Sequence, residues 1–565
     1  MSNLAMKRFL AFGIAVLATC SQAATFPKDD QAIVHVLSRI GYGPRPGDVD
    51  KVRAMGIQRY IDEQLRPDRI ADPAMAAHLD GLTSTRLSSR QIEEQYELPQ
   101  LEARRLKQQN AKGGDTPAPP VAGMPPDPVQ QKANSVVVEL SEQKVLRAVY
   151  SERQLEEVLS DFWFNHFNVD ARKGRDRFLL TEYERDTIRP RVLGKFRDLL
   201  EATAKSPAML FYLDNWMSAR PGPDFNLAPG AVPGGRIVRG PFGGRFVAPP
   251  RQTGPDLNLA PARKKAPKGL NENYGRELME LHTLGVDGGY TQKDVTEVAR
   301  AFTGWTIDNP RQGGGFKFEP RIHDTGQKLV LGHVIAAGGG ERDGEQVLDI
   351  LAKSPATAHF IATKLVRRFV SDTPPPALVD RAAARFRDTD GDLREVMRTI
   401  LTSPEFLSPE AYRAKVKTPF EFVVSALRAT GAEVADAKPL VRELQQLGMP
   451  LYQCQPPTGY KDTGEAWVNT GALVSRMNFA LRLAGNQVPK VIVGNGQSSD
   501  GSHQSAAGRR QAPGGGLPSS VDSDAAIAQF LSGDASDTTR ATIAKATTVP
   551  QMAALTLGSP EFQRR

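Results

Sequence analysis

The chain has 565 residues, of which 40% are hydrophobic and 24% are charged, and its net charge is +8. This composition is ordinary for a globular protein and excludes a disordered or fibrous chain. Two cysteines are too few for a disulfide framework, so the fold must depend on its apolar core. The positive charge is concentrated in residues 219–268, with nine basic residues against two acidic ones. A basic excess confined to one insert argues against nucleic acid as the partner.

The N-terminus has the pattern of a cleaved secretory signal. Lys7 and Arg8 precede an apolar stretch, residues 9–19, that is too short to span a bilayer. Small residues then precede a cleavage site at Ala24, so we expect a periplasmic or extracellular protein. A lipoprotein signal ending at Cys20 is the less favoured alternative. No later segment is apolar for long enough to predict a transmembrane span.

Helical periodicity runs through most of the remaining sequence, so the expected fold is mostly α: a multi-helix packed domain with long low-complexity insertions. Apolar spacing predicts a helix through Ile33 to Ile40 and a second from about Pro46 to Leu65. Three stretches rich in Gly, Pro, Ser or Arg lack the apolar content of a core. The predicted organisation is a signal peptide (1–23), an N-terminal helical region (24–105), a flexible linker (106–135), a first helical core region (136–218), a basic Gly/Pro-rich insert (219–268), a second helical core region (269–490), a second flexible linker (491–520) and a C-terminal helical segment (521–565).

Local signals mark where helices begin. Ser or Thr can cap the first free amides of a helix, and a following Pro fits its first turn. A capping box adds an acidic or amide side chain three residues after the cap. The sequence predicts helix starts at Ser206-Pro207, Ser354-Pro355, Ser403-Pro404, Thr418-Pro419 and Ser559-Pro560, and capping boxes at Ser151 with Gln154, Thr291 with Asp294 and Asp392 with Glu395.

The first candidate for chemistry is the phrase DFWFNHF, at the end of the helix that follows Ser151. His166 continues an apolar stripe through Leu159 and Phe162, so its ring is expected to point into the core. A buried histidine needs a hydrogen-bond partner or a ligand. Asp161 and Asn165, four residues apart, share a neighbouring face of the helix.

The second candidate is the helix predicted around Asn273 to Leu284. Glu277 and Glu280 lie about 60° apart on it, so they could share a cation, or one could hold the other protonated. His282 lies about 160° further round, so all three cannot bind one ion from a regular helix. A divalent metal would need a histidine from elsewhere, and His166 is the natural choice.

Two further features have both a structural and a functional interpretation. The His323-Asp324 pair, in a loop or short strand after Trp305, could serve a site or a turn. Cys454 has no partner once Cys20 is removed, and we interpret it as a small buried hydrophobe rather than a nucleophile.

Two functions therefore remain open. One is a hydrolase in which the candidate residues position and deprotonate a water, with or without a metal. The other is a non-catalytic assembly or binding protein, in which the same side chains form a buried polar network with arginines such as Arg367 and Arg368. The candidate catalytic residues are His166, Glu277, Glu280, Asp161 and His282.

The basic insert contains a repeat, GPDFNLAP at 222–229 and GPDLNLAP at 254–261. An expanded surface loop explains it on composition alone. The alternative is a basic arm that docks on an anionic surface such as lipid headgroups or acidic glycan.

Phrases spread over more than half of the expected mature chain resemble a bacterial family catalogued as domain of unknown function 1800. The matching phrases are DFWFNHF (161–167), NENYGRELMELHTLG (271–285), AFTGW (301–305), HDTGQKLVLG (323–332), KLVRRFV (364–370) and TPFEFVVSALRATG (418–431). The resemblance implies an exported, large, mostly helical protein with no settled activity. Genes of such proteins often lie beside those of another exported family, domain of unknown function 1501, which implies a partner in the cell envelope.

Overall fold

The structure is a computed structural model that describes residues 29–112, 127–220, 269–310, 313–494, 517, 518 and 520–565, together with two short strands between residues 236 and 248. The predicted signal peptide lies outside the described residues, as do nearly all of the basic insert and most of the second predicted linker.

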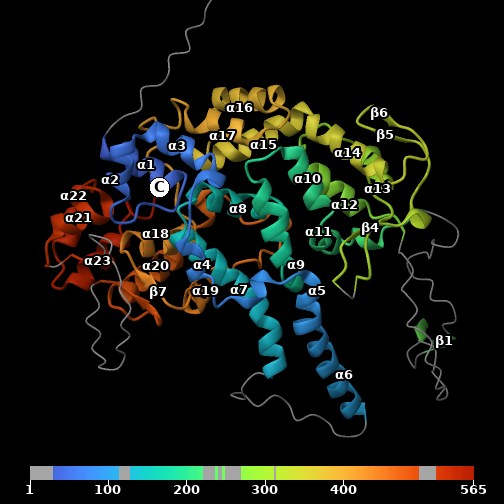
Figure 1. Ribbon diagram of the computed structural model, residues 1–565, viewed down its shortest axis with the longest axis horizontal. Helices are drawn as coiled ribbons and strands as arrows, with labels where there is room; N and C mark the ends of the chain where they lie inside the picture. The colour runs from blue at the N-terminus through green and yellow to red at the C-terminus, as the bar shows by residue number, and fades with distance from the viewer. Residues whose placement is uncertain are drawn as a thin grey trace, which may run out of the picture.

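The fold is mostly α, as the periodicity predicts (Figure 1). The α-helices are α1 (Asp30–Arg39), α2 (Asp48–Met55), α3 (Ile57–Gln64), α4 (Ala74–His78), α5 (Ser89–Ile92), α6 (Leu98–Lys112), α7 (Pro128–Tyr150), α8 (Gln154–His166), α9 (Asp176–Glu182), α10 (Phe196–Ala204), α11 (Pro207–Tyr212), α12 (Glu272–Glu280), α13 (Gln292–Ala301), α14 (Arg342–Lys353), α15 (Pro355–Phe369), α16 (Pro376–Asp388), α17 (Leu393–Leu401), α18 (Pro419–Ala429), α19 (Lys438–Gln446), α20 (Thr470–Ala484), α21 (Ser523–Leu531), α22 (Asp537–Ile543) and α23 (Val549–Leu557).

The strands form four separate antiparallel pairs. They are β1 (Arg236–Arg239) with β2 (Arg245–Ala248), β3 (Trp305–Ile307) with β4 (Phe316–Phe318), β5 (Lys328–Val330) with β6 (His333–Ile335), and β7 (Glu433–Val434) with β8 (Val491–Ile492). Among the described residues, no helix is both long enough and apolar enough to cross a membrane.

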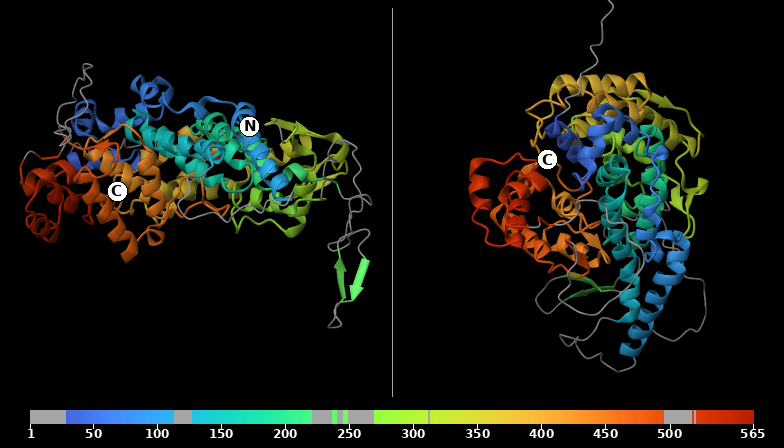
Figure 2. Two further views of the ribbon diagram at one scale, coloured as in Figure 1. Left: turned by 90° about the horizontal axis from the view of Figure 1, so that it is seen from below. Right: turned by 60° about the vertical axis from the view of Figure 1, so that its left-hand side comes forward.

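The first and last helices of the chain lie at the same end of the molecule. Figure 1 shows α1–α3 beside α21–α23 at one end and α12–α14 with the β5–β6 hairpin at the other. Helix α6 and the first half of α7 run side by side and project from the body (Figure 2). One continuous apolar core extends from Ile33 to Phe562, so the predicted N-terminal, central and C-terminal helical regions pack together.

Backbone pairing also joins the C-terminal residues to the middle of the chain. Val416 and Arg564 form an antiparallel bridge, and the Lys417 amide donates to the carbonyl oxygen of Gln563 at 2.9 Å. The final residues therefore form a wall beside the start of α18.

Some predicted boundaries differ from the observed ones. The helix predicted from Pro46 to Leu65 is two helices, because Gly56 has φ +87° and breaks the run between α2 and α3. Helix α6 extends to Lys112, and α7 begins at Pro128 with Asp127 as its cap, so both ends of the predicted linker 106–135 are helical.

The helix-start signals have mixed outcomes. The capping box of Thr291 with Asp294 is present, and Ser354 and Thr418 cap α15 and α18. Asp392 caps α17, but the reciprocal bond of the predicted capping box with Glu395 is missing. Ser206 precedes α11 but makes no capping hydrogen bond.

Three of these predictions are wrong. Ser403 and Ser559 do not start helices. Instead each accepts a hydrogen bond in a turn, from the amide of Phe406 at 3.1 Å and of Phe562 at 3.2 Å. Ser151 forms no capping box, because α8 begins at Gln154, two residues later than a cap at Ser151 requires, and the Ser151 hydroxyl donates to Asp72 at 2.6 Å.

Candidate functional site

The last turns of α8 present two chemically different faces. Asp161 and Asn165 face a pocket, whereas His166 lies in the core on the other side of the helix, as its apolar stripe predicts. The DFWFNHF phrase thus contributes to two separate sites.

The pocket is built around an ion pair. Lys144 of α7 approaches Asp161 to 2.7 Å, and their side chains are 11% and 18% exposed. The Lys144 ammonium also lies 5.1 Å from the ring centre of Tyr452 and 5.5 Å from that of Phe164. Aromatic faces attract a cation, so Lys144 is held from two sides.

Residues 452–462 form the opposite wall of the pocket. Side chains at the end of α8 and just after it hold this segment by hydrogen bonds to the segment's backbone. The Asn165 amide nitrogen donates to the Tyr460 carbonyl at 2.8 Å, and its side-chain oxygen accepts from the Tyr460 amide at 2.7 Å. Asn168 donates to the carbonyl oxygens of Cys454 and Pro456, both at 2.9 Å. These asparagines fix the position of the wall.

Gly459 allows this close approach. It has φ +73°, and a Cβ atom built on it would lie 2.2 Å from the carbonyl oxygen of Asn165. Only glycine fits both the backbone conformation and the space.

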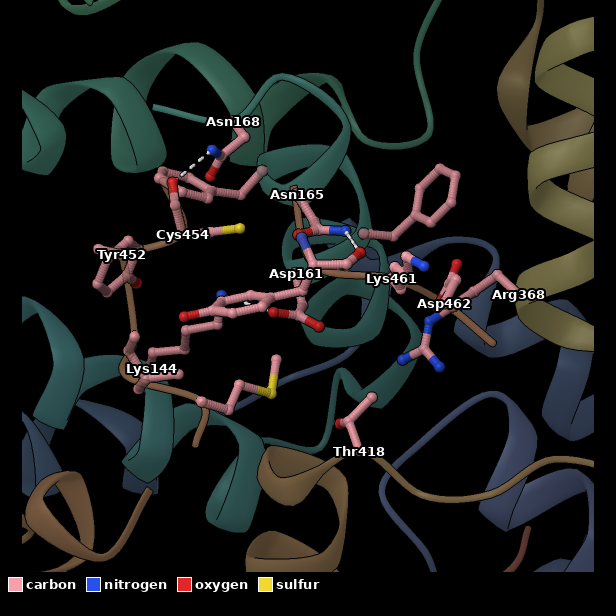
Figure 3. A pocket seen from close by; sticks show the side chains of 15 residues that line it. Lys144, Asp161, Asn165, Asn168, Arg368, Thr418, Tyr452, Cys454, Lys461 and Asp462 are labelled. Atoms are coloured by element: carbon pink, nitrogen blue, oxygen red, sulfur yellow. Dashed lines mark hydrogen bonds and ion pairs between the residues drawn. The ribbon is translucent and has the colours of Figure 1, made fainter. Parts of the chain in front are cut away.

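The resulting cavity is small and mixed in character. Its volume is about 40 Å³, enough for a few water molecules or one small polar group. Figure 3 shows the labelled side chains around it. The lining residues are Lys144, Asp161, Phe162, Phe164, Asn165, Asn168, Arg368, Thr418, Met449, Leu451, Tyr452, Cys454, Tyr460, Lys461 and Asp462.

The Cys454 thiol belongs to this lining. The residue is buried, and burial together with the nearby Asp170 carboxylate raises the pKa of the thiol to about 11. A thiol with this pKa is protonated at neutral pH and is a weak nucleophile.

His166 lies in a buried polar cluster. Its Nε2 atom lies 3.1 Å from the carbonyl oxygen of His282, and its Nδ1 atom lies 2.9 Å from Nζ of Lys364 in α15. A carbonyl oxygen only accepts, so Nε2 carries the proton and Nδ1 accepts from the lysine. Both ring nitrogens are therefore engaged within the protein.

Burial determines the charge of this cluster. It lowers the pKa of His166 well below its usual range, with the Lys364 charge adding to the effect. It also lowers the pKa of His282 to about 3 and that of Lys364 to about 8. Both histidines are neutral at pH 7.

The two glutamates lie apart from His166. Glu277 is half-buried, and burial followed by the Glu280 charge raises its pKa. Glu280 accepts a hydrogen bond from the Tyr290 hydroxyl at 3.0 Å. Among the described residues, no hydrogen bond or ion pair connects either glutamate to His166 or to Asp161. The structure thus brings His166 and His282 together and Glu277 and Glu280 together, but it does not join the two pairs.

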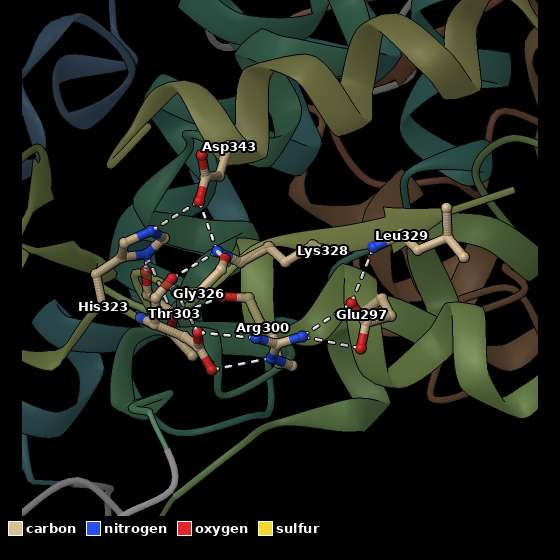
Figure 4. A network of polar contacts seen from close by, with 9 residues as sticks. Glu297, Arg300, Thr303, His323, Gly326, Lys328, Leu329 and Asp343 are labelled. Carbon is tan, nitrogen blue, oxygen red and sulfur yellow. Dashed lines mark hydrogen bonds and ion pairs between the residues drawn. The ribbon is translucent and has the colours of Figure 1, made fainter. Parts of the chain in front are cut away.

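His323 and Asp324 tie secondary-structure elements together (Figure 4). His323 Nε2 lies 3.1 Å from an Asp343 oxygen that also accepts from Lys328 at 2.6 Å, and all three side chains are buried. Asp324 pairs with Arg300 of α13 at 2.9 Å. The network connects β5, α13 and α14. These contacts give the His323-Asp324 pair a structural role.

Sequence reasoning missed Lys144, Lys364 and the wall 452–462. Lys364 belongs to the KLVRRFV phrase, so that phrase was the available signal. In the described part of the chain, no group of three or more His, Cys, Asp or Glu side chains is arranged to hold a metal ion.

The fold and these sites define a large, mostly helical protein with a small pocket of mixed polar and aromatic lining at the end of α8. The chain belongs to the family described as "Protein of unknown function (DUF1800)", whose model matches residues 35–564. No curated protein and no solved structure matches the chain.

Proposed function

We propose that the protein is an exported, non-catalytic binding protein of the cell envelope, and that it binds its ligand in the pocket between α8 and residues 452–462. The observation that carries the proposal is the Asp161–Lys144 ion pair, which lies in a small cavity with aromatic walls. Ligand sites commonly combine an apolar lining with a few placed polar groups. The cavity admits only a small polar group, so the ligand is either a small molecule or the end of a longer chain.

At this pocket, binding is favoured over hydrolysis by the state of the groups that line it and of His166 behind it. The accepting nitrogen of His166 is occupied by Lys364, and His166 does not line the pocket. The Cys454 thiol is protonated, and the Asp161 carboxylate is paired with Lys144. A general base must reach the proton that it removes, and none of these groups is free to do so in this arrangement.

The pocket is tested by removing the ion pair as a unit. Asp161→Asn alone leaves Lys144 without its partner charge and is expected to destabilise the protein, whereas Asp161→Asn with Lys144→Met removes both charges at little cost in stability. The matched control replaces the exposed pair Arg59 and Glu63 of α3 with glutamine.

Melting temperatures are then measured with a panel of amino acids, dipeptides, amino sugars and monosaccharides. A compound that stabilises the wild type and the control, but not the double variant, supports the proposal. If every stabilising compound acts equally on the double variant, or if none acts at all, the pocket is not the binding site.

Export and partners are included in the same proposal. The N-terminal pattern predicts a mature start at Ala24, and the resemblance implies a partner from the domain of unknown function 1501 family. The basic insert 219–268 would contact an anionic surface. Cell fractionation with mass spectrometry of the mature N-terminus tests export, and a cytoplasmic protein that retains Met1 would contradict it.

A further inference from the structure

A second pocket lies where the two ends of the described chain meet. It is enclosed by α1, the segment before α18, α21 and the last residues of the chain, and its volume is about 40 Å³. The lining residues that matter for its chemistry are Arg413, Lys417, Glu561, Phe562, Arg564 and Arg565. It is distinct from the Asp161 pocket, and the two share no lining residue.

Lys417 is the central feature of this pocket. The residue is only 5% exposed, and its ammonium lies 3.9 Å from the ring centre of Phe562. Across the described ranges, its side chain makes neither a hydrogen bond nor an ion pair. Burying an ammonium group without an acceptor is costly, so a protein normally provides it with an anion.

The remaining charged side chains of the lining are mostly positive. Arg413, Arg564 and Arg565 accompany Lys417, and Glu561 is the acidic member. The Glu561 carboxylate is already engaged, since it accepts from the hydroxyls of Ser536 at 2.7 Å and Thr539 at 2.9 Å.

Buried cations behind the pocket add to this excess. Arg39, Arg368, Lys417, Arg476 and Arg565 all interact with the buried carboxylate of Glu421. Asp161, Asp372 and Asp462 also act on Arg39 or Arg368, but Asp161 and Asp372 are already paired with Lys144 and Lys415. Several guanidinium nitrogens of the cluster have no hydrogen-bond partner in the described structure. They are Nε and Nη1 of Arg39, Nε and Nη2 of Arg476, and Nε of Arg565, which meets Glu421 only as an ion pair.

Three cations of the cluster have lowered pKa values, whereas the pKa of Arg368, beside Glu421, is raised. Burial lowers the pKa of Lys417 to about 7, of Arg39 to about 9 and of Arg476 to about 10. Arg39 and Arg476 therefore stay charged at pH 7, whereas Lys417 is only about half protonated, and an anionic neighbour would raise its pKa and complete its charge.

We propose that this pocket binds a compact oxyanion, such as a sulfate, a phosphate or a carboxylate group, through Lys417 with Arg413 and Arg565. Arg413 already pairs with Asp534 at 2.9 Å and Arg565 with Glu421 at 3.0 Å, so these guanidinium groups would add only their remaining N–H donors. Lys417 supplies the unpaired charge at the buried end. The oxyanion can be a free ion or the head group of a small acid, and its binding would join α1 and α21 to the start of α18.

The test measures binding of sulfate, inorganic phosphate and acetate by calorimetry and by melting temperature, with ionic strength held constant with sodium chloride. The wild type is compared with Lys417→Met, which keeps the length of the side chain, and with Lys293→Met, which removes an exposed lysine from α13. We expect saturable binding of at least one anion, weakened at least tenfold by Lys417→Met and unchanged by Lys293→Met. Lys417→Arg is expected to restore most of the affinity.

The pattern of binding distinguishes the two kinds of ligand. Preference for sulfate and phosphate indicates a tetrahedral anion, whereas preference for acetate indicates the carboxylate of a small acid. If no anion binds saturably, or if Lys417→Met binds as tightly as the wild type, the proposal is wrong. Should Lys417→Met not fold, Arg564→Ser, which alters an exposed side chain of the lining, is expected to weaken binding at least threefold, and unchanged affinity in that variant would equally overturn it.

Discussion

Lys364 donates a hydrogen bond to Nδ1 of His166 at 2.9 Å across 198 residues of sequence, and this contact occupies the nitrogen that a general base would need. The other ring nitrogen donates to the carbonyl oxygen of His282. His166 therefore connects α8 to α15 and to the segment that follows α12.

Replacing His166 with alanine is expected to destabilise the protein by about 3 kcal/mol, because it opens a cavity and leaves a buried amine and a carbonyl without partners. The measurement is urea unfolding followed by circular dichroism. His359→Ala, an exposed histidine of α15, is the control and should change the unfolding free energy by less than about 0.5 kcal/mol. An equally stable His166→Ala protein would show that the cluster is not structural.

Acid should destabilise the fold through its buried histidines. Burial lowers the pKa of His35 and His282 to about 3, whereas an unfolded chain has histidine pKa values near 6.5. The unfolded state therefore binds more protons below about pH 6.5, and stability falls as pH falls from 6.5 toward 3. Each such histidine contributes about 1 kcal/mol of loss between pH 6.5 and 5.5.

The contribution of one buried histidine is isolated by comparing the wild type with a variant that lacks it. Glu93 and Glu142, whose pKa values burial raises to about 7, titrate in the opposite sense over the same window. The loss of unfolding free energy between pH 6.5 and 5.5 is therefore measured in the wild type and in His282→Gln. The wild type is predicted to lose about 1 kcal/mol more than the variant. The exposed His333→Gln variant should give a difference near zero, and equal values for both variants would contradict the assignment.

Gly459 offers a matched pair of substitutions with Gly448. Both residues have positive φ, but a Cβ at Gly448 meets no atom within 4 Å, whereas one at Gly459 meets the Asn165 carbonyl. Gly448→Ala is expected to cost about 1–2 kcal/mol from backbone strain alone. Gly459→Ala should cost at least about 2 kcal/mol more, because it also displaces the wall of the pocket. Similar melting temperatures for the two variants would mean that α8 does not hold this wall.

Asp176 should be neutral in the folded protein. It is fully buried, neither carboxylate oxygen has a hydrogen-bond partner in the described structure, and burial raises its pKa well above the usual range. Above about pH 4 the unfolded chain loses the proton that the folded state keeps, so the wild type loses stability as pH rises.

Asp176→Asn removes that loss and is expected to be more stable than the wild type by about 1–2 kcal/mol at pH 8 and by little at pH 4. Asp287→Asn, a change at an exposed turn, should leave the unfolding free energy unchanged at both pH values. A destabilised Asp176→Asn protein at pH 8 would show that the carboxylate is ionised.

Local features of the fold could be predicted from the sequence, because they depend on neighbouring residues. The capping box at Thr291 and the cap at Thr418 need only side chains three residues away, and the burial of His166 follows from helical spacing. The failures at Ser403 and Ser559 have a local cause as well, since the same Ser-Pro phrase also closes turns.

The candidate sites could be predicted only incompletely, because their partners come from distant segments. Lys364 meets His166 across 198 residues, and Tyr460 meets Asn165 across 295. Periodicity shows which face of a helix is buried, but it does not show what packs against that face. Asp161 could therefore be named as a candidate, while Lys144 and the wall 452–462 could not.

The most direct test of the central claim is the rate at which Cys454 is alkylated with and without a stabilising ligand from the panel. Cys454 lines the Asp161 pocket, and peptide mass spectrometry distinguishes it from Cys20. Iodoacetamide at pH 9 is suitable because the thiol pKa is about 11. Binding in the pocket predicts at least fivefold slower alkylation with the ligand present, and no slowing in the Asp161→Asn, Lys144→Met double variant. An unchanged rate at saturating ligand in the wild type would place the binding site elsewhere and contradict the account.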